Sequence, residues 1–247
     1  MLAVLVAFVA SAASFDPQMT WRTIRTEHFD ITFHQGLEHV ADEFAREVEP
    51  VYATMSAEVR WEPRARTQVV LVDRTDDANG YASVVPYNAI VIFVTAPQEN
   101  SSLSFYEDWS SAILTHELTH VLHMDANHGI VRAARAVVGR VATTNDVSPL
   151  WMIEGFATFQ ETRHTTGGRG RTPYVDMVKR ASVLEDAFPP LGDLDGLQPK
   201  PPSGNLRYLF GQDFMQFVAD TTGEDVWTKW VHTYGSWVPF WLPTKRV

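Results

Sequence analysis

The stretch that decides the fold is His116-Glu117-Leu118-Thr119-His120, which has the pattern H-E-x-x-H. It lies in a segment, Asp108 to roughly Asp125, that is apolar on most sides and is predicted to form a buried central helix. Residues four apart share one face of a helix, so the two imidazoles can bind one metal ion together. Glu117 projects beside them, where its carboxylate can take a proton from a metal-bound water.

A third ligand is predicted on a second helix. Ser148-Pro149 is typical of a helix start, with Ser as the cap and Pro in the first turn, and the helix is predicted to end near Thr165. Glu154 would face inward on this largely apolar segment, where a carboxylate is costly unless it is paired or binds a metal. An ion pair without a metal is the alternative interpretation.

The composition limits the chemistry that such a site can use. The 247 residues are 45% hydrophobic and 20% charged, which is typical of a globular protein with a substantial core. The formal net charge of -10 argues against nucleic acid as a partner. The chain has no cysteine, so a metal must be held by His, Asp or Glu, a ligand set that suits a catalytic zinc with an open position.

Residues 1–14 (MLAVLVAFVASAAS) have the pattern of a secretory signal peptide, with a short apolar run and a small-residue cleavage pattern at Ala10-Ser11-Ala12. The run is too short to span a bilayer, so no transmembrane anchor is expected. No Lys or Arg follows Met1, which departs from the usual signal pattern. We expect an exported protein, periplasmic or extracellular.

The remaining sequence divides into strands followed by helices. Trp21 to Phe33 alternates in the manner of a strand, and Gln68–Val72 and Ala89–Val94 are further predicted strands. Asp73–Pro86 is predicted to be a loop, with a turn at Asn79-Gly80. Other helices are predicted over Gly36–Val59, Ile130–Val141, Tyr174–Asp186, Leu206–Ala219 and Glu224–His232, with a loop over Pro189–Gly204.

This order predicts an α+β fold with two lobes and a cleft between them. The sheet-containing lobe is expected over residues 15–125 and the helical lobe over residues 126–247. Ile130–Val141 is amphipathic and carries Arg132, Arg135 and Arg140; we favour a solvated helix face over contact with a membrane or a substrate. The apolar stretch Trp237–Leu242 is predicted to meet either the helical lobe or a further domain.

With the helices placed, the chain resembles the gluzincin metallopeptidases, zinc enzymes with an H-E-x-x-H pattern and a Glu ligand on a following helix. Most similar is the aminopeptidase-like branch, whose second helix reads W-x-x-E-G-x-A-x-x-x-E, as do Trp151 through Glu161 here. Tyr208-Leu209-Phe210-Gly211 matches a later Tyr-x-x-Gly element, and Glu27-His28-Phe29 and Gly168-Arg169-Gly170 resemble a bacterial exported subset. In that subset a β-propeller often follows the peptidase domain.

The resemblance implies a zincin-like fold and zinc ligands His116, His120 and Glu154. It implies Glu117 as the general base, Tyr208 as hydrogen-bond donor to the oxyanion, and Glu161 as the acid that orients a zinc-bound histidine. The substrate would be a peptide or protein. The predicted strand Ala89–Val94 could hold it in extended form by strand addition.

Two features depart from the aminopeptidases. The stretch between His120 and Glu154 is longer, and an insertion there would lie at the rim of the cleft. The Gly-x-Met-x-Asn element, which holds a free amino end, is missing from the candidate strand Asn88–Thr95. Endo- and exopeptidase action therefore both remain open.

Two further histidines and two other functions compete with this interpretation. His123 lies one turn after His120, but three histidines on one helix cannot easily surround one ion, which favours a role lining the cleft or supporting a ligand. His128 could complete a metzincin-like set only if Gly stood at position 123 and His at position 126, and this chain has His123 and Ala126. The alternatives are a zinc-binding docking module without catalysis and a zinc hydrolase acting on a non-peptide amide or ester.

Overall fold

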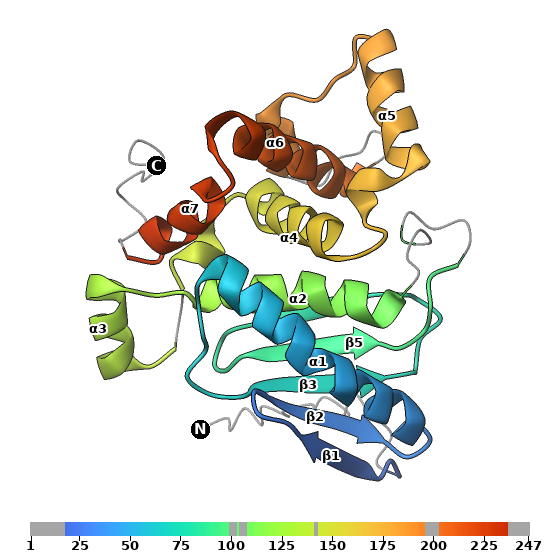
Figure 1. Cartoon of the computed structure of the whole chain (residues 1–247), viewed down its shortest axis with the longest axis vertical. Helices are drawn as coiled ribbons and strands as arrows, with labels where there is room; N and C mark the ends of the chain where they lie inside the picture. Colours follow the sequence, from blue (N-terminus) through green and yellow to red (C-terminus); the bar gives the residue numbers. More distant parts are fainter. Residues whose placement is uncertain (1–17, 99–102, 104–107, 141–142, 196–202, 237–247) are drawn as a thin grey trace, which may run out of the picture.

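The five strands lie in the N-terminal part of the chain, with helix α1 between β2 and β3, and the other described helices follow (Figure 1). The computed structural model describes residues 18–98, 103, 108–140, 143–195 and 203–236. This part has an α+β architecture: an N-terminal five-stranded mixed sheet with helices, then a helical region.

The sheet has the strand order β1-β2-β3-β5-β4. The β2–β3 and β3–β5 pairs are parallel, and the β1–β2 and β4–β5 pairs are antiparallel. The strands are β1 (Trp21–Arg25), β2 (Phe29–His34), β3 (Thr67–Val72), β4 (Gly80–Ser83) and β5 (Ala89–Phe93).

The predicted strand from Trp21 to Phe33 is in fact a hairpin. The amide of Thr26 donates to the carbonyl of Phe29 and closes the turn between β1 and β2. Phe29, Ile31 and Phe33 lie on one buried face of β2, as their alternation predicts. The alternating pattern therefore spans two strands, where the sequence alone predicts a single strand.

The prediction of a loop over Asp73–Pro86 is wrong at β4, which pairs with β5 from the Gly80↔Ile92 register onward. The prediction that Ala89–Val94 accepts a peptide strand is also wrong, because β5 is paired on both sides, with β3 and with β4. The outermost described strand on this side of the sheet is β4. A strand with both neighbours in place has no backbone groups left for a peptide.

Helices α1 (Glu38–Val59) and α2 (Trp109–Asp125) contribute to one apolar core with the sheet. Alternate residues of β2, β3 and β5 are buried, and α1 adds an apolar stripe that includes Phe44, Val48 and Met55. Helix α2 contacts α1, β4, β5 and α4, so it joins the sheet to the helical region. Its burial on nearly every side agrees with the predicted central helix.

The helical region contains α3 (Gly129–Val138), α4 (Leu150–His164), α5 (Pro173–Leu184), α6 (Leu206–Thr222) and α7 (Val226–Tyr234). Helices α4 and α6 pack along one another (Figure 1). A Cβ added at Gly155 would lie 2.6 Å from the carbonyl carbon of Gly211, so only glycine allows the two backbones to approach this closely. The loop predicted over Pro189–Gly204 contains the short 3-10 helices Leu191–Asp195 and Ser203–Asn205.

Helix α3 differs from the solvated arginine face that its sequence predicts. The side chain of Arg135 is only 10% exposed and forms an ion pair with the buried Asp125, while Val137 is 85% exposed. Arg135 is thus turned toward the protein and Val137 toward solvent, while Arg132 of the same helix is exposed, as the sequence predicts. The need of Asp125 for a cationic partner explains this orientation, because a buried unpaired carboxylate is costly.

None of the helices in the described ranges is both long enough and apolar enough to cross a membrane. The predicted signal segment, residues 1–14, and the apolar stretch Trp237–Leu242 both lie outside the described residues. The division into lobes at residue 125 stays a prediction.

Candidate metal centre

Helix α2 places His116 and His120 on one face, one turn apart. The carboxylate of Asp108 caps the helix by accepting from the amide of Ser111 (3.1 Å). Both histidines are buried, and their rings meet edge to face with centroids 4.7 Å apart. The i, i+4 spacing therefore brings two imidazoles together, as predicted.

Helix α4 brings Glu154 to the same place, but it does not begin as predicted. The hydroxyl of Ser148 is buried and has no hydrogen-bond partner among the described residues, so the prediction that Ser148 caps this helix is wrong. Pro149 occupies the cap position, and the amide of Leu150 donates to the carboxylate of Asp195 instead. A carboxylate from a distant turn replaces the local hydroxyl because it is the stronger acceptor.

Three ligand atoms converge between the two helices. The Nε2 atoms of His116 and His120 are 3.1 Å apart, and Glu154 Oε2 lies 3.4 Å from the first and 3.2 Å from the second. Ligands at the corners of a tetrahedron around zinc, with bonds of about 2.0 to 2.1 Å, lie about 3.3 to 3.4 Å apart. The triangle has nearly this size, so the cluster of His116, His120 and Glu154 could hold a metal ion.

The charges around this cluster favour a cation. Burial and the Arg169 guanidinium act to lower the pKa of His116, yet hydrogen bonds to Glu154 and Glu161 raise it to about 9. Burial acts to raise the pKa of Glu154, but His120 and His116 hold it well below its usual range. The carboxylate is therefore ionised and ready to bind a cation.

Glu161 holds His116 from the side away from the cluster. Its Oε2 lies 2.8 Å from His116 Nδ1, which leaves Nε2 free to offer its lone pair to a metal when Nδ1 carries the proton. The orienting role that the resemblance implies for Glu161 stays a prediction. The Nδ1 atom of His120, by contrast, is buried without a hydrogen-bond partner in the described part of the chain.

Glu117 lies beside the two histidines and is buried. Burial raises the pKa of its carboxyl group, although His116 and His120 act against the shift. Gly80 of β4 packs directly on it: a Cβ at that position would lie 3.0 Å from Glu117 Cγ and 3.1 Å from Oε1. The edge strand therefore touches the acid next to the metal cluster.

A pocket of about 320 Å³ opens onto these groups. Its walls include residues of β4, α2 and α4, together with Arg169, Tyr208 and Asp146. Burial, then the nearby Glu154 carboxylate, raise the pKa of Tyr208 to about 12, so its hydroxyl keeps its proton at neutral pH and can donate a hydrogen bond. A larger cavity of about 490 Å³ lies elsewhere, beside His28 and Arg64, away from this chemistry.

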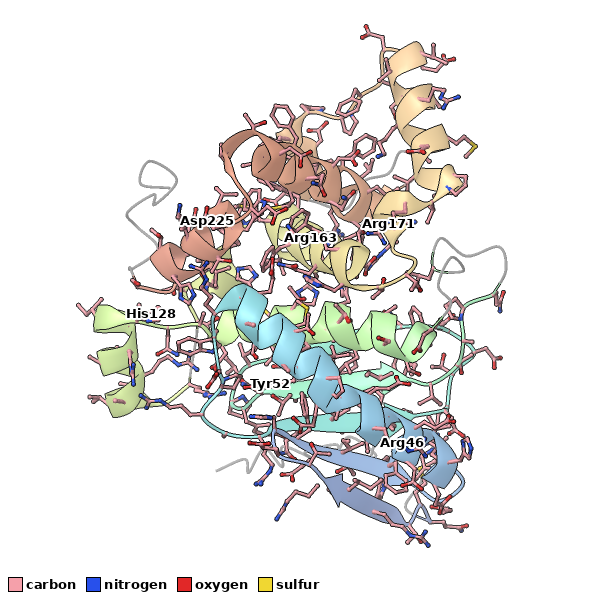
Figure 2. The ribbon with its side chains drawn as sticks, viewed as in Figure 1. Arg46, Tyr52, His128, Arg163, Arg171 and Asp225 are labelled. Atoms are coloured by element: carbon pink, nitrogen blue, oxygen red, sulfur yellow. The ribbon has the colours of Figure 1, made fainter. Side chains whose placement is uncertain are left out.

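The structure places His123 away from the pocket. It is fully buried, with Trp230 and Phe156 against its ring, and neither ring nitrogen has a hydrogen-bond partner among the described residues. His128, labelled in Figure 2, precedes α3 and contacts His232 of α7 at 2.6 Å instead of joining the cluster.

Several residues at the pocket do not follow from sequence reasoning. Gly80 and its strand were predicted as loop, and Asp146 belongs to the insertion between His120 and Glu154 without any motif of its own. Asp146, from this insertion, lines the pocket, as expected for an insertion at the rim of the cleft. The one signal for Arg169 was its place between two glycines in Gly168-Arg169-Gly170.

Comparison with known proteins leaves the function open. No family profile matches this chain. The chain is similar to an uncharacterized protein of Treponema pallidum (strain Nichols), with 26% identity over 204 residues. The match covers 82% of this chain and 18% of the relative, so the chain spans only a small part of the relative's length.

Proposed function

We propose that this chain is an exported zinc-dependent hydrolase of the gluzincin type, with a zincin-like two-lobed fold, that cleaves peptide bonds. One observation carries the proposal: His116, His120 and Glu154 form a triangle of ligand size, and the buried acid Glu117 stands beside it at the wall of a pocket. A metal site needed only for structure would have four protein ligands and no adjacent base. Among the described residues this cluster has three ligands, an arrangement with a position for water.

Zinc bound there would lower the pKa of a coordinated water to about 7 and polarise a substrate carbonyl. Glu117 takes the proton of the attacking water on its carboxylate and passes it to the leaving amine. Tyr208 donates its hydroxyl hydrogen to the oxygen that gains negative charge, a contribution typically worth about 3 kcal/mol. Glu161 keeps His116 in the tautomer that faces the metal.

The edge strand β4 suggests how a peptide would bind. Its outer edge carries no partner strand within the described residues, and Asn79 through Ala82 line the pocket. An extended peptide could add to this edge, which would bring a scissile carbonyl past Glu117. The proposal takes β4, in place of the strand predicted from sequence, as the substrate strand.

Location and partners form the second part of the proposal. Residues 1–14 support export to the periplasm or the extracellular space. A neighbouring domain such as a β-propeller is supported by the resemblance, and the relative is much longer than this chain.

The decisive test compares the purified wild type with Glu117→Gln. Both should contain one zinc ion per chain, but casein cleavage should fall by about 100-fold to 10,000-fold in Glu117→Gln, because the general base is lost. Glu224→Gln, an exposed acid in the helical region, is the matched control and should keep full activity.

Each other outcome supports a named alternative. Zinc binding without Glu117-dependent hydrolysis of any substrate would leave a docking module. Hydrolysis of amide or ester substrates that depends on Glu117, with no cleavage in a mixed peptide library, would indicate a non-peptide hydrolase. A wild type without zinc would overturn the proposal.

A further inference from the structure

Arg169 is a buried cation at the wall of the metal pocket. It begins the short 3-10 helix Arg169–Arg171, which follows α4, and it is 7% exposed. Arg171 of the same turn, labelled in Figure 2, is exposed and donates to the carbonyls of Thr165 and Gly167. The two arginines thus point to different surroundings, and only Arg169 faces the pocket.

The guanidinium of Arg169 grips both oxygens of Glu161. Its Nε donates to Oε1 (2.8 Å) and its Nη2 to Oε2 (2.7 Å), and its backbone amide donates to Oε1 (3.3 Å). The same Oε2 is 2.8 Å from His116 Nδ1. Nη2 and Nδ1 also approach to 2.8 Å, and because a guanidinium only donates, we take this approach as two donors sharing one carboxylate oxygen.

The planar guanidinium of Arg169 also contacts the ring of Tyr208. Its central carbon lies 4.5 Å from the centre of the Tyr208 ring, in the geometry of a cation–π contact. The Tyr208 ring is itself 6.1 Å from the ring of His116, centroid to centroid. One side chain therefore contacts both the acid behind a metal ligand and the tyrosine at the pocket wall.

The glycines on either side explain how Arg169 reaches this position. Gly168 has φ +96°, and a Cβ there would lie 2.6 Å from Thr162 Cα of α4. A Cβ on Gly170 would lie 2.8 Å from the side-chain amide carbon of Gln212 of α6. The Gly-Arg-Gly sequence lets the turn press between α4 and α6, so that the arginine enters from their junction.

We propose that Arg169 is a positioning residue, which fixes the Glu161 carboxylate behind His116 and the Tyr208 ring beside the pocket at the same time. The inference rests on the proposed function, because it assigns Arg169 to the same site. A planar guanidinium can pair with a carboxylate through two hydrogen bonds and stack on an aromatic ring, whereas a lysine ammonium cannot do both. Charge alone therefore does not replace it.

The first test measures metal affinity by competition with a chromophoric chelator. Arg169→Lys should weaken zinc binding by about 10-fold to 100-fold, the usual cost of disturbing a group that orients a metal ligand. Arg171→Lys, which changes the neighbouring arginine in the same way, should leave the affinity unchanged. Equal affinity of Arg169→Lys and the wild type would overturn the proposal.

A double-mutant cycle tests the route through Glu161. Arg169→Met together with Glu161→Gln removes both buried charges, which guards against a variant that fails to fold. The double variant should bind zinc within about 2-fold of Glu161→Gln alone, because the two residues act through one contact. A further loss of about 10-fold or more would show that Arg169 acts by another path and would overturn the proposal.

Kinetics at saturating zinc test the contact with Tyr208. Arg169→Lys should lower kcat with KM nearly unchanged, and the same substitution in a Tyr208→Phe background should have a much smaller effect on kcat. Full additivity of the two substitutions would overturn this part. If the wild type hydrolyses nothing, the proposed function fails on its own, while the zinc affinities still decide whether Arg169 positions Glu161.

Discussion

Helix α2 holds histidines of opposite character at two positions, about two turns apart along the helix. His116 faces two carboxylates, from Glu154 and Glu161, and its pKa is raised to about 9. His123 faces the rings of Phe156 and Trp230, and burial, then the charge of His120, lower its pKa to about 3. One helix therefore holds one histidine, His116, as a cation and another, His123, as a neutral group.

The difference shows what turns a histidine into a metal ligand here. The helix supplies both kinds of position, but only His116 and His120 receive carboxylates, and those come from α4. Gly155, whose contact with Gly211 lets α4 and α6 lie close together, is on the same helix as Glu154 and Glu161. The identity of the site is therefore set by the helical region as much as by H-E-x-x-H.

The largest expected effect separates the metal cluster from the buried position of His123. His120→Ala removes a ligand and should weaken zinc binding by about 100-fold or more, since zinc sites have apparent binding free energies of about 10 to 16 kcal/mol shared among their ligands. His123→Leu, three residues along the same helix, should keep the affinity within about 2-fold. Competition with a chromophoric chelator measures both affinities, and an equal loss in the two variants would mean that the two positions do not differ in metal binding.

The next effect concerns stability in acid. The pKa of His123 is about 3 in the folded protein against an ordinary value of 6.5, so the unfolded chain binds the extra proton as the pH falls. The stability is fully present above pH 6.5 and is lost below it, at up to about 1.4 kcal/mol per pH unit. Urea unfolding between pH 7 and pH 5 should show this loss in the wild type.

Two variants sharpen that measurement. His123→Leu should lose about 2 kcal/mol less stability than the wild type between pH 6.5 and pH 5, because no proton has to be excluded from the core. His39→Leu changes an exposed histidine of α1 and should follow the wild-type curve. Parallel curves for His123→Leu and the wild type would contradict the buried, neutral histidine.

The sequence predicts the metal cluster well, but not the surroundings of His123. The i, i+4 spacing identifies His116 and His120, and the cost of burying a carboxylate identifies Glu154, because both arguments are local to a helix. The surroundings of His123 depend on Trp230, more than a hundred residues later, and no local pattern contains that contact. Arg169 escapes prediction for the same reason, since its partners lie on α2, α4 and α6.

Some elements of the fold can likewise be predicted from the sequence, and others cannot. Long periodic segments such as α1, α2 and α4 can be predicted because each has an apolar face or an apolar interior of many residues. Strand β4 cannot, because Gly80–Ser83 is short and only partly buried, and its pairing is decided by β5. The cap of α4 was misplaced because Asp195, distant in sequence, competes with the local Ser148.

The smallest effect is the number of protons released when zinc binds to the metal cluster. With a pKa of about 9, His116 is protonated at pH 7.5 in the metal-free protein, and a metal must displace that proton to reach Nε2. Calorimetry in buffers of different ionisation enthalpy should therefore find about one proton released per zinc at pH 7.5, and the number should fall as the pH rises through 9. Glu161→Gln removes one of the carboxylates that raise this pKa, so fewer protons should be released, whereas His123→Leu should release as many as the wild type. A release near zero at pH 7.5 in the wild type would mean that His116 is already neutral, and the electrostatic contrast between His116 and His123 would be lost.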